Sequence, residues 1–167
     1  FQYNVNINNQ NAPGNTNITN GKIRFNSSTI SQSTLLYIST NTSVLTNQNG
    51  TSIDLKTFFS FIQERTSSIK TFIIIYKKTD SSKKIVFSVN DINVHNTYNH
   101  ATFSLDREVA FSSDDAPFEE DDDVILSFKI LGDKGPEGPP VDGGGVIPYE
   151  PFSNIIGHDS ISLVNTT

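Results

Sequence analysis

Apolar and polar residues alternate over residues 1–8, which predicts a β-strand with one buried face. The apolar positions are Phe1, Tyr3, Val5 and Ile7. Residues 9–21 form a polar stretch with one proline and two glycines, which is typical of a connector. We therefore expect residues 1–21 to form an extended N-terminal arm and linker.

The arm needs a partner, because an isolated strand leaves its backbone groups and its apolar face uncovered. It either folds back onto its own domain or adds a strand to the sheet edge of a neighbouring subunit. We favour the neighbour. Under that hypothesis the partners of the arm are other copies of the chain or other proteins of the same assembly.

Short apolar runs separated by turns rich in Ser, Thr and Asn predict a β domain over residues 22–131. We expect strands at residues 23–25, 35–37, 69–76, 85–89, 101–105, 108–111 and 124–130. The strand at residues 69–76 is apolar on both faces, which is typical of a central strand. Short strands at this spacing, with hairpin signals between them, predict a mainly β fold, an antiparallel β-sandwich of the jelly-roll-like kind.

One short helix is predicted within this domain. The apolar positions that recur at helical spacing are Leu55, Phe58, Phe59 and Ile62. Ser52 or Asp54 can cap the helix by accepting a hydrogen bond from a free backbone N–H. We expect the helix to end near Arg65.

Three Gly-X-Y triplets follow the last predicted strand and start at Gly132, Gly135 and Gly138. Glycine at every third position lets three polyproline II chains meet at a common axis, so the triplets predict a homotrimer with these glycines at its axis. The same residues also fit a Pro/Gly-rich linker. We treat residues 132–145 as a collagen-like, Gly-rich segment and residues 146–167 as a C-terminal tail, for which pairing with a neighbouring subunit is one role.

Charge and composition exclude several classes of partner. The chain has 167 residues and a net charge of −6, and it contains no cysteine. Nucleic acid is not expected as a partner, because phosphate binding needs a basic face. A membrane is not expected either, because no apolar run approaches the roughly 20 residues of a span.

Candidate catalytic and metal-binding groups are weak. His95 and His100 could share a loop and recruit Asp91 or Asp106 as metal ligands, but solvated histidines are common in Asn-rich loops. His158 has an aspartate and a serine beside it, although the members of a catalytic triad converge from separate elements. We predict no catalytic residues, no metal site and no cofactor.

An acidic run is the remaining candidate for a cation site. It comprises Asp114, Asp115, Glu119, Glu120, Asp121, Asp122 and Asp123. The spacing of a calcium-binding EF-hand is absent, so we interpret the run as a solvated loop that protects a strand edge. The glycines at residues 143–145 lack the Lys-Ser/Thr of a phosphate-binding loop.

Four segments together resemble a known family. They are GKIRF at Gly21–Phe25, LLYIS at Leu35–Ser39, GTSIDLKTFFSFI at Gly50–Ile62 and the passage from DDDVILSFKI into GDKGPEGPP at Asp121–Pro140. This arrangement is similar to the compact β domain that precedes collagen-like repeats in structural proteins of marine tailed bacteriophages. The resemblance implies a non-enzymatic virion protein, a trimeric tail-fibre or capsid-decorating (appendage) subunit.

Two other functions fit the residues. The alternating arm could make the chain an extracellular, cell-surface filament subunit that polymerises by strand donation. Loop aromatics could make it a receptor- or glycan-binding module, and the candidates are Tyr98, Tyr149 and Phe152.

Overall fold

The computed structural model describes residues 1–14, 16–45, 52–112, 117–133 and 135. The chain divides into two units, Phe1–Lys134 and Gly135–Thr167. The predicted tail at residues 146–167 and most of the segment at residues 132–145 lie outside the described residues. Among the described residues, no helix has the length and apolar content needed to cross a membrane.

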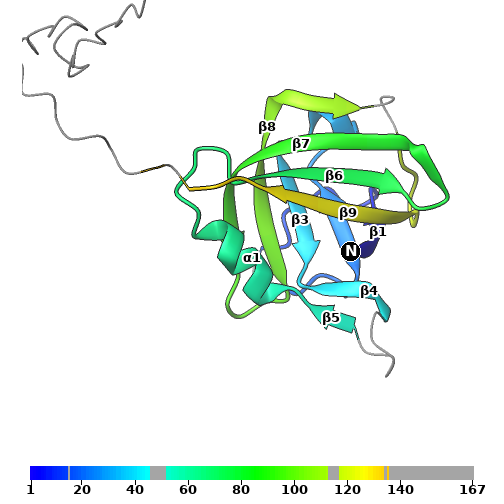
Figure 1. Ribbon diagram of the computed structural model, residues 1–167. Helices are drawn as coiled ribbons and strands as arrows, with labels where there is room; N and C mark the ends of the chain where they lie inside the picture. Colours follow the sequence, from blue (N-terminus) through cyan, green and yellow to red (C-terminus); the bar gives the residue numbers. More distant parts are fainter. Residues whose placement is uncertain (15, 46–51, 113–116, 134, 136–167) are drawn as a thin grey trace, which may run out of the picture. The chain divides into compact units, whose positions relative to one another are not determined.

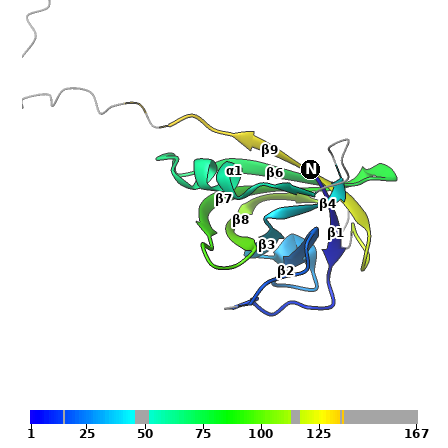
Figure 2. The same ribbon diagram turned by 90° about the horizontal axis from the view of Figure 1, so that it is seen from below.

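The first unit is built mainly of β-strands (Figure 1). Its elements are β1 (Gln2–Asn6), β2 (Lys22–Phe25), the 3₁₀ turn η1 (Ile30–Gln32), β3 (Leu35–Ser39), β4 (Asn41–Leu45), β5 (Ser52–Asp54), α1 (Lys56–Gln63), β6 (Thr71–Lys77), β7 (Asp80–Val94), β8 (His100–Ser112) and β9 (Asp123–Ile130). Seven of these strands close into a barrel in the order β1-β2-β3-β8-β7-β6-β9, and β4 and β5 form a separate two-stranded sheet. The barrel therefore has no free edge at either β9 or β2 (Figure 2).

The predicted antiparallel, jelly-roll-like β-sandwich is wrong. The fold is a closed, mixed barrel, because β1 pairs in parallel with β2 and antiparallel with β9. Alternating apolar residues mark one buried face, and that signal is the same whether the buried faces meet in a sandwich or in a barrel. The prediction of a mainly β fold with one short helix is confirmed.

The interior of the barrel is filled by the alternating apolar residues of its strands. On β6, Ile73 and Ile75 are fully buried between β7 and β9. On β7, the alternation shifts at a bulge between Val89 and Asp91 and then resumes with Ile92. A bulge adds one residue to a strand without ending it. It explains why the predicted short strand at residues 85–89 is part of a strand of 15 residues.

The strand pattern of β8 differs from the prediction in a similar way. The runs at residues 101–105 and 108–111 were expected as two strands, and they form one strand of 13 residues. β8 pairs with β7 over most of its length, and register shifts separate the two parts of that ladder. The bulged ladder joins both runs, because two neighbouring long strands can keep pairing past an irregularity.

Helix α1 packs across one end of the barrel. Its N-cap residue is Leu55, and neither predicted side chain caps the helix, although Asp54 Oδ1 accepts a hydrogen bond from the Lys56 backbone N–H at 2.9 Å. Phe59 is fully buried, and its ring contacts Phe103 of β8 and Phe128 of β9, at centroid distances of 5.2 and 5.8 Å. β8 and β9 are not neighbours in the barrel, so the Phe59 ring connects two separate parts of the barrel wall.

The predicted arm forms β1, one of the strands of the barrel wall. Tyr3 and Val5 are fully buried, Ile7 packs partly buried against the core, and Phe1 remains 39% exposed. The Tyr3 hydroxyl donates to the Ser39 carbonyl at 2.9 Å, which satisfies the buried phenol. In the single chain, the strand therefore folds back onto its own domain, which is one of the two arrangements expected from the sequence.

The predicted linker at residues 9–21 is docked onto the barrel by Asn99. The Asn99 side chain accepts a hydrogen bond from the Ile18 backbone N–H at 2.9 Å and donates to the Ile18 carbonyl at 2.7 Å. Its backbone N–H also donates to Asn17 Oδ1 at 3.0 Å. Asn99 thus satisfies both backbone polar groups of Ile18, as a neighbouring β-strand would, and the Ile18 side chain is buried.

Candidate functional site

Two features of the barrel bear on assembly, and the first is the seam where β1 closes it. At the start of the strand, the Phe1 amine donates to the Leu126 carbonyl at 2.8 Å, and the Leu126 backbone N–H donates to the Phe1 carbonyl at 2.7 Å. Partial burial lowers the pKa of this amine. Further along, the strand has three register partners on β9 and three on β2.

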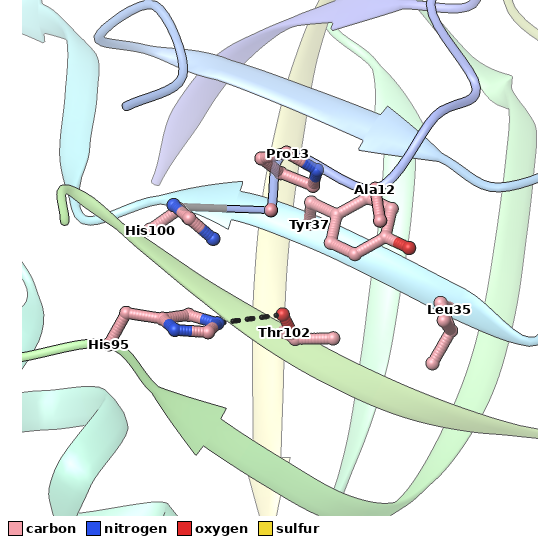
Figure 3. Close-up of a pocket in the computed structure, with 8 residues that line it drawn as sticks. Ala12, Pro13, Leu35, Tyr37, His95, His100 and Thr102 are labelled. Atoms are coloured by element: carbon pink, nitrogen blue, oxygen red, sulfur yellow. Dashed lines mark hydrogen bonds between the residues drawn. The ribbon is translucent and has the colours of Figure 1, made fainter. Parts of the chain in front are cut away.

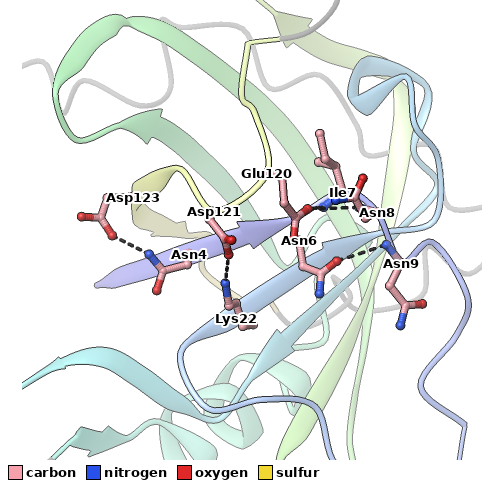
Figure 4. A network of polar contacts seen from close by, with 9 residues as sticks. All are labelled: Asn4, Asn6, Ile7, Asn8, Asn9, Lys22, Glu120, Asp121 and Asp123. Atoms are coloured by element: carbon pink, nitrogen blue, oxygen red, sulfur yellow. Dashed lines mark hydrogen bonds and ion pairs between the residues drawn. The ribbon is translucent and has the colours of Figure 1, made fainter.

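Acidic side chains hold β1 in this seam (Figure 4). Asn4 Nδ2 donates to Asp123 Oδ1 at 2.5 Å, on the β9 side. Glu120 Oε2 accepts hydrogen bonds from the backbone N–H groups of Ile7 and Asn8, at 2.6 and 3.1 Å. Hydrogen bonds to an ionised carboxylate are among the stronger ones, so the end of the strand is firmly attached.

The same acidic run also contacts β2, which lies beside β1, and β6, which lies on the far side of β9. Lys22 of β2 forms an ion pair with Asp121, and Lys77 of β6 forms one with Asp122 at 2.7 Å. Burial alone would raise the pKa of Asp122, but hydrogen bonds from Lys77 and from the Glu119 backbone N–H hold that pKa below its usual value. The described carboxylates of the run thus join three strands at the seam.

Sequence reasoning missed this role. The run was interpreted as a solvated loop that protects a strand edge, whereas its described members contact β1, β2 and β6. A signal was available in the alternating asparagines of the arm, which offer amide donors to a neighbouring acidic loop. Asp114 and Asp115 lie outside the described residues.

The second feature is the point where the chain leaves the barrel. After β9, Leu131 donates its backbone N–H to the Lys70 carbonyl at 3.2 Å. Asp133, in the first triplet, then accepts hydrogen bonds from Arg65 Nη1 at 2.9 Å and from the Thr66 backbone N–H at 3.1 Å. Arg65 itself lies over the Phe61 ring, 4.0 Å from its centroid. The first triplet is therefore attached to the segment that follows α1.

The described triplet glycines have open space around them. A Cβ atom built on Gly132 or on Gly135 would meet no heavy atom within 4 Å, and neither residue has a left-handed φ. Within the part of the chain that the structure describes, no contact therefore requires glycine at these two positions. Gly138 lies outside the described residues.

The predicted histidine pair is brought together on the outer face of the barrel (Figure 3). The ring centroids of His95 and His100 lie 4.3 Å apart, and His95 Nε2 lies 3.2 Å from Thr102 Oγ1. They line a pocket of about 260 Å³, whose other lining residues are Ala12, Pro13, Gly14, Leu35, Tyr37 and Thr102. The docked connector supplies one wall of this pocket, and β3 and β8 supply the opposite one.

His100 is buried, unlike the solvated histidine that the sequence suggested. It is 1% exposed, and its Nδ1 atom has no hydrogen-bond partner in the described ranges of the chain. Burial, with the neighbouring His95 and Arg24, lowers the pKa of His100 to about 4. The ring is therefore neutral at neutral pH.

Asp91 and Asp106, the described ligand candidates besides the histidines, do not join His95 and His100 in a ligand group. Asp91 lies on β7 opposite Ser104, and Asp106 lies on β8 opposite Ser88. Within the described residues, no group of three or more His, Cys, Asp or Glu side chains could hold a metal ion. His158 and the glycines at residues 143–145 lie outside the described residues.

Comparison of the chain with protein-family models, with curated proteins and with solved structures finds no match. The similarity to bacteriophage structural domains therefore stays a prediction from the sequence segments that carry it. The seam, the exit of the chain and the outer pocket are the described features that bear on function.

Proposed function

We propose that the chain is a non-enzymatic structural subunit of a virion, a trimeric fibre or capsid-decorating protein. In this proposal the barrel is a compact head, and the Gly-X-Y segment joins three copies. The sequence resemblance supplies the virion part of the proposal. The geometry supports the assembly part.

The observation that carries the proposal is the attachment of the first triplet through Asp133. Two hydrogen bonds, donated by Arg65 and Thr66, hold Asp133 against the segment that follows α1. A flexible linker gains nothing from such an attachment, whereas three chains that must meet at one axis gain from a fixed start, since less conformational freedom is then lost on association. Three triplets are too short to hold a triple helix alone, so contacts between other parts of the subunits add to them.

Gly135→Ala tests the role of the triplets. A methyl group fits at Gly135 in the single chain, so the unfolding of the barrel should not change. At the axis of a triple helix the same methyl group has no room, so the trimer should be lost or should melt at a clearly lower temperature. Light scattering gives the mass, and a thermal melt gives the stability.

Lys129→Ala is a matched control, because this side chain is exposed on β9 just before the triplets. It should leave both the mass and the melt unchanged. A monomeric wild-type chain, or a trimer that Gly135→Ala leaves intact, would contradict the proposal.

Strand donation is a second candidate, and the position of β1 favours it. This strand is joined to β2 through the connector at residues 7–21 and pairs with both neighbours over short registers. A neighbouring copy could supply an identical strand to the same seam, because strand exchange keeps every contact. Head-to-tail exchange would build the filament.

A cysteine pair distinguishes closure within a chain from exchange between chains. Gln2 and Ile125 are register partners, and the wild-type chain contains no cysteine. In the Gln2→Cys/Ile125→Cys variant, strand donation predicts covalent oligomers on a non-reducing gel, and self-closure predicts a crosslinked monomer. The Gln2→Cys single variant shows how much crosslinking arises from random collision.

A further inference from the structure

The histidine pair on the outer face has a geometry that the assembly role does not explain. We propose that His95 and His100 bind one divalent transition-metal ion of the zinc, nickel or copper type, with the remaining coordination positions open to the adjoining pocket. This inference is independent of the proposed virion role. Either could fail without the other.

The hairpin between β7 and β8 places the two imidazoles side by side. The His95 backbone N–H donates to the His100 carbonyl at 3.2 Å, so the two residues face each other across the end of the hairpin. Their ring centroids lie 4.3 Å apart, and the ring planes are tilted by 38°.

That spacing is close to what a shared ion needs. With each nitrogen about 2.0–2.1 Å from the ion and the two bonds roughly 90–110° apart, the ring centroids would lie about 4.5–5.2 Å apart. The observed separation is slightly shorter. A movement of the half-buried His95 ring would adjust this centroid separation to the value that a shared ion requires.

An unsatisfied atom points to a missing ligand at this place. His100 Nδ1 is buried and has no hydrogen-bond partner among the described residues, and the whole residue is 1% exposed. Buried polar atoms are almost always paired, and an exception calls for a bound ion, a water molecule or a functional reason. A metal ion satisfies a neutral imidazole nitrogen directly.

The surroundings hold the two rings in place. Thr102 Oγ1 lies 3.2 Å from His95 Nε2, and Tyr98 stacks near His100 with a centroid distance of 6.2 Å and a plane angle of 24°. Asn99, one residue before His100, ties the hairpin to the docked connector. Such supporting contacts orient the ligands of a metal ion and increase its affinity.

The donor set decides which ion fits. Imidazole nitrogens suit zinc, copper and nickel, whereas calcium and magnesium require several oxygen ligands. No described carboxylate joins the two histidines in a ligand group. Two protein ligands leave the other positions to water or a small anion, for which the pocket of about 260 Å³ has space.

Calorimetric titration of the full chain with zinc or nickel chloride tests the proposal. The His158→Gln variant serves as the background, because the chain has three histidines and this change leaves only the proposed pair. We expect one ion per chain with wild-type affinity in that background. Adding His95→Gln or His100→Gln should weaken binding by about tenfold or more. Calcium and magnesium should give no heat of binding.

His95→Gln is the decisive variant, because His95 is half-buried and its replacement should not disturb the fold. Wild-type affinity in the His95→Gln/His158→Gln variant would overturn the proposal, and so would the absence of zinc and nickel binding in the wild type. A second measurement needs no variant at all. In nuclear magnetic resonance spectra of the wild type, nickel should broaden the imidazole signals of His95 and His100 first, and broadening confined to His158 would also overturn the proposal.

Discussion

Glycine is required at Gly21, where the connector enters β2, and not at the described triplet positions. Gly21 has φ of 72°, and a Cβ atom there would lie 2.4 Å from the Cα atom of Ser43. Its backbone also joins two strands, because its N–H donates to the Asn41 carbonyl and its carbonyl accepts from the Asn4 N–H, both at 2.8 Å. The residue therefore needs both a left-handed backbone and the absence of a side chain.

Gly21→Ala should accordingly destabilise the barrel more than Gly14→Ala does. Gly14 has φ of 58° but open space around it, so its replacement carries only the left-handed backbone cost of about 1–2 kcal/mol. At Gly21 the clash with Ser43 adds to that cost. Urea unfolding followed by circular dichroism measures the difference. Equal losses of stability in the two variants would contradict the close approach of β2 and β4.

At the scale of elements, β1 depends on the carboxylates that surround it. Its pairing with each neighbour is short, and further bonds come from Glu120 in the loop before β9 and from Asp123 at the start of β9. Asp122 adds an ion pair with Lys77 nearby. The loop and the seam should therefore respond to pH together.

Acid should weaken this seam through Asp122. Because the folded-state pKa of Asp122 is lowered, the ionised form stabilises the fold, and this contribution is complete above the ordinary carboxyl pKa of about 3.9. It is lost as the pH falls through the lowered value. Urea unfolding of the wild type should thus show a fall in the free energy of unfolding below about pH 4, and hydrogen exchange should show earlier opening of β1.

Lys77→Gln should reduce that pH dependence, because it removes the partner of Asp122. Lys78→Gln is the matched control, since Lys78 is an exposed neighbour in the turn after β6. A pH profile that neither replacement changes would mean that the ion pair contributes nothing to the seam.

For the whole molecule, the core lies within the unit Phe1–Lys134. A chain that ends at Lys134 should therefore fold with the same urea midpoint as the full chain, because it keeps every core residue that the structure describes. Circular dichroism during urea unfolding measures the midpoint. A midpoint that falls clearly below that of the full chain would show that residues 135–167 contribute to the stability of the barrel.

Local patterns in the sequence predicted the helix and the strands of the barrel, but not the two-stranded sheet of β4 and β5 or the closure of the barrel. Ile73 and Ile75 in β6, and Phe59 and Ile62 in α1, are buried as their spacing predicts. The pairing of Gln2 with Ile125 joins residues that are far apart in the chain, and no local pattern specifies such a register.

The candidate site was predictable to a similar extent. The sequence placed His95 and His100 in one loop, but the burial of His100 depends on the connector that covers it, and this connector was interpreted as a free linker. The attachment of the first triplet also escaped prediction. Asp133 was considered only as part of a triplet. Its partners Arg65 and Thr66 lie far earlier in the chain, just after α1, and no local pattern links them to Asp133.

The pairing of β1 with β9 also sets the order of events during synthesis. Ribosomes make the N-terminal strand first, but its partner residues near Leu126 emerge only when almost the whole barrel has been made. Closing so large a loop is slow, because contacts distant in sequence form late in folding. Until then β1 lacks its β9 partner, and the barrel is incomplete. Under the strand-donation proposal, this interval is the time at which a second chain could supply its own β1 to the open position beside β9.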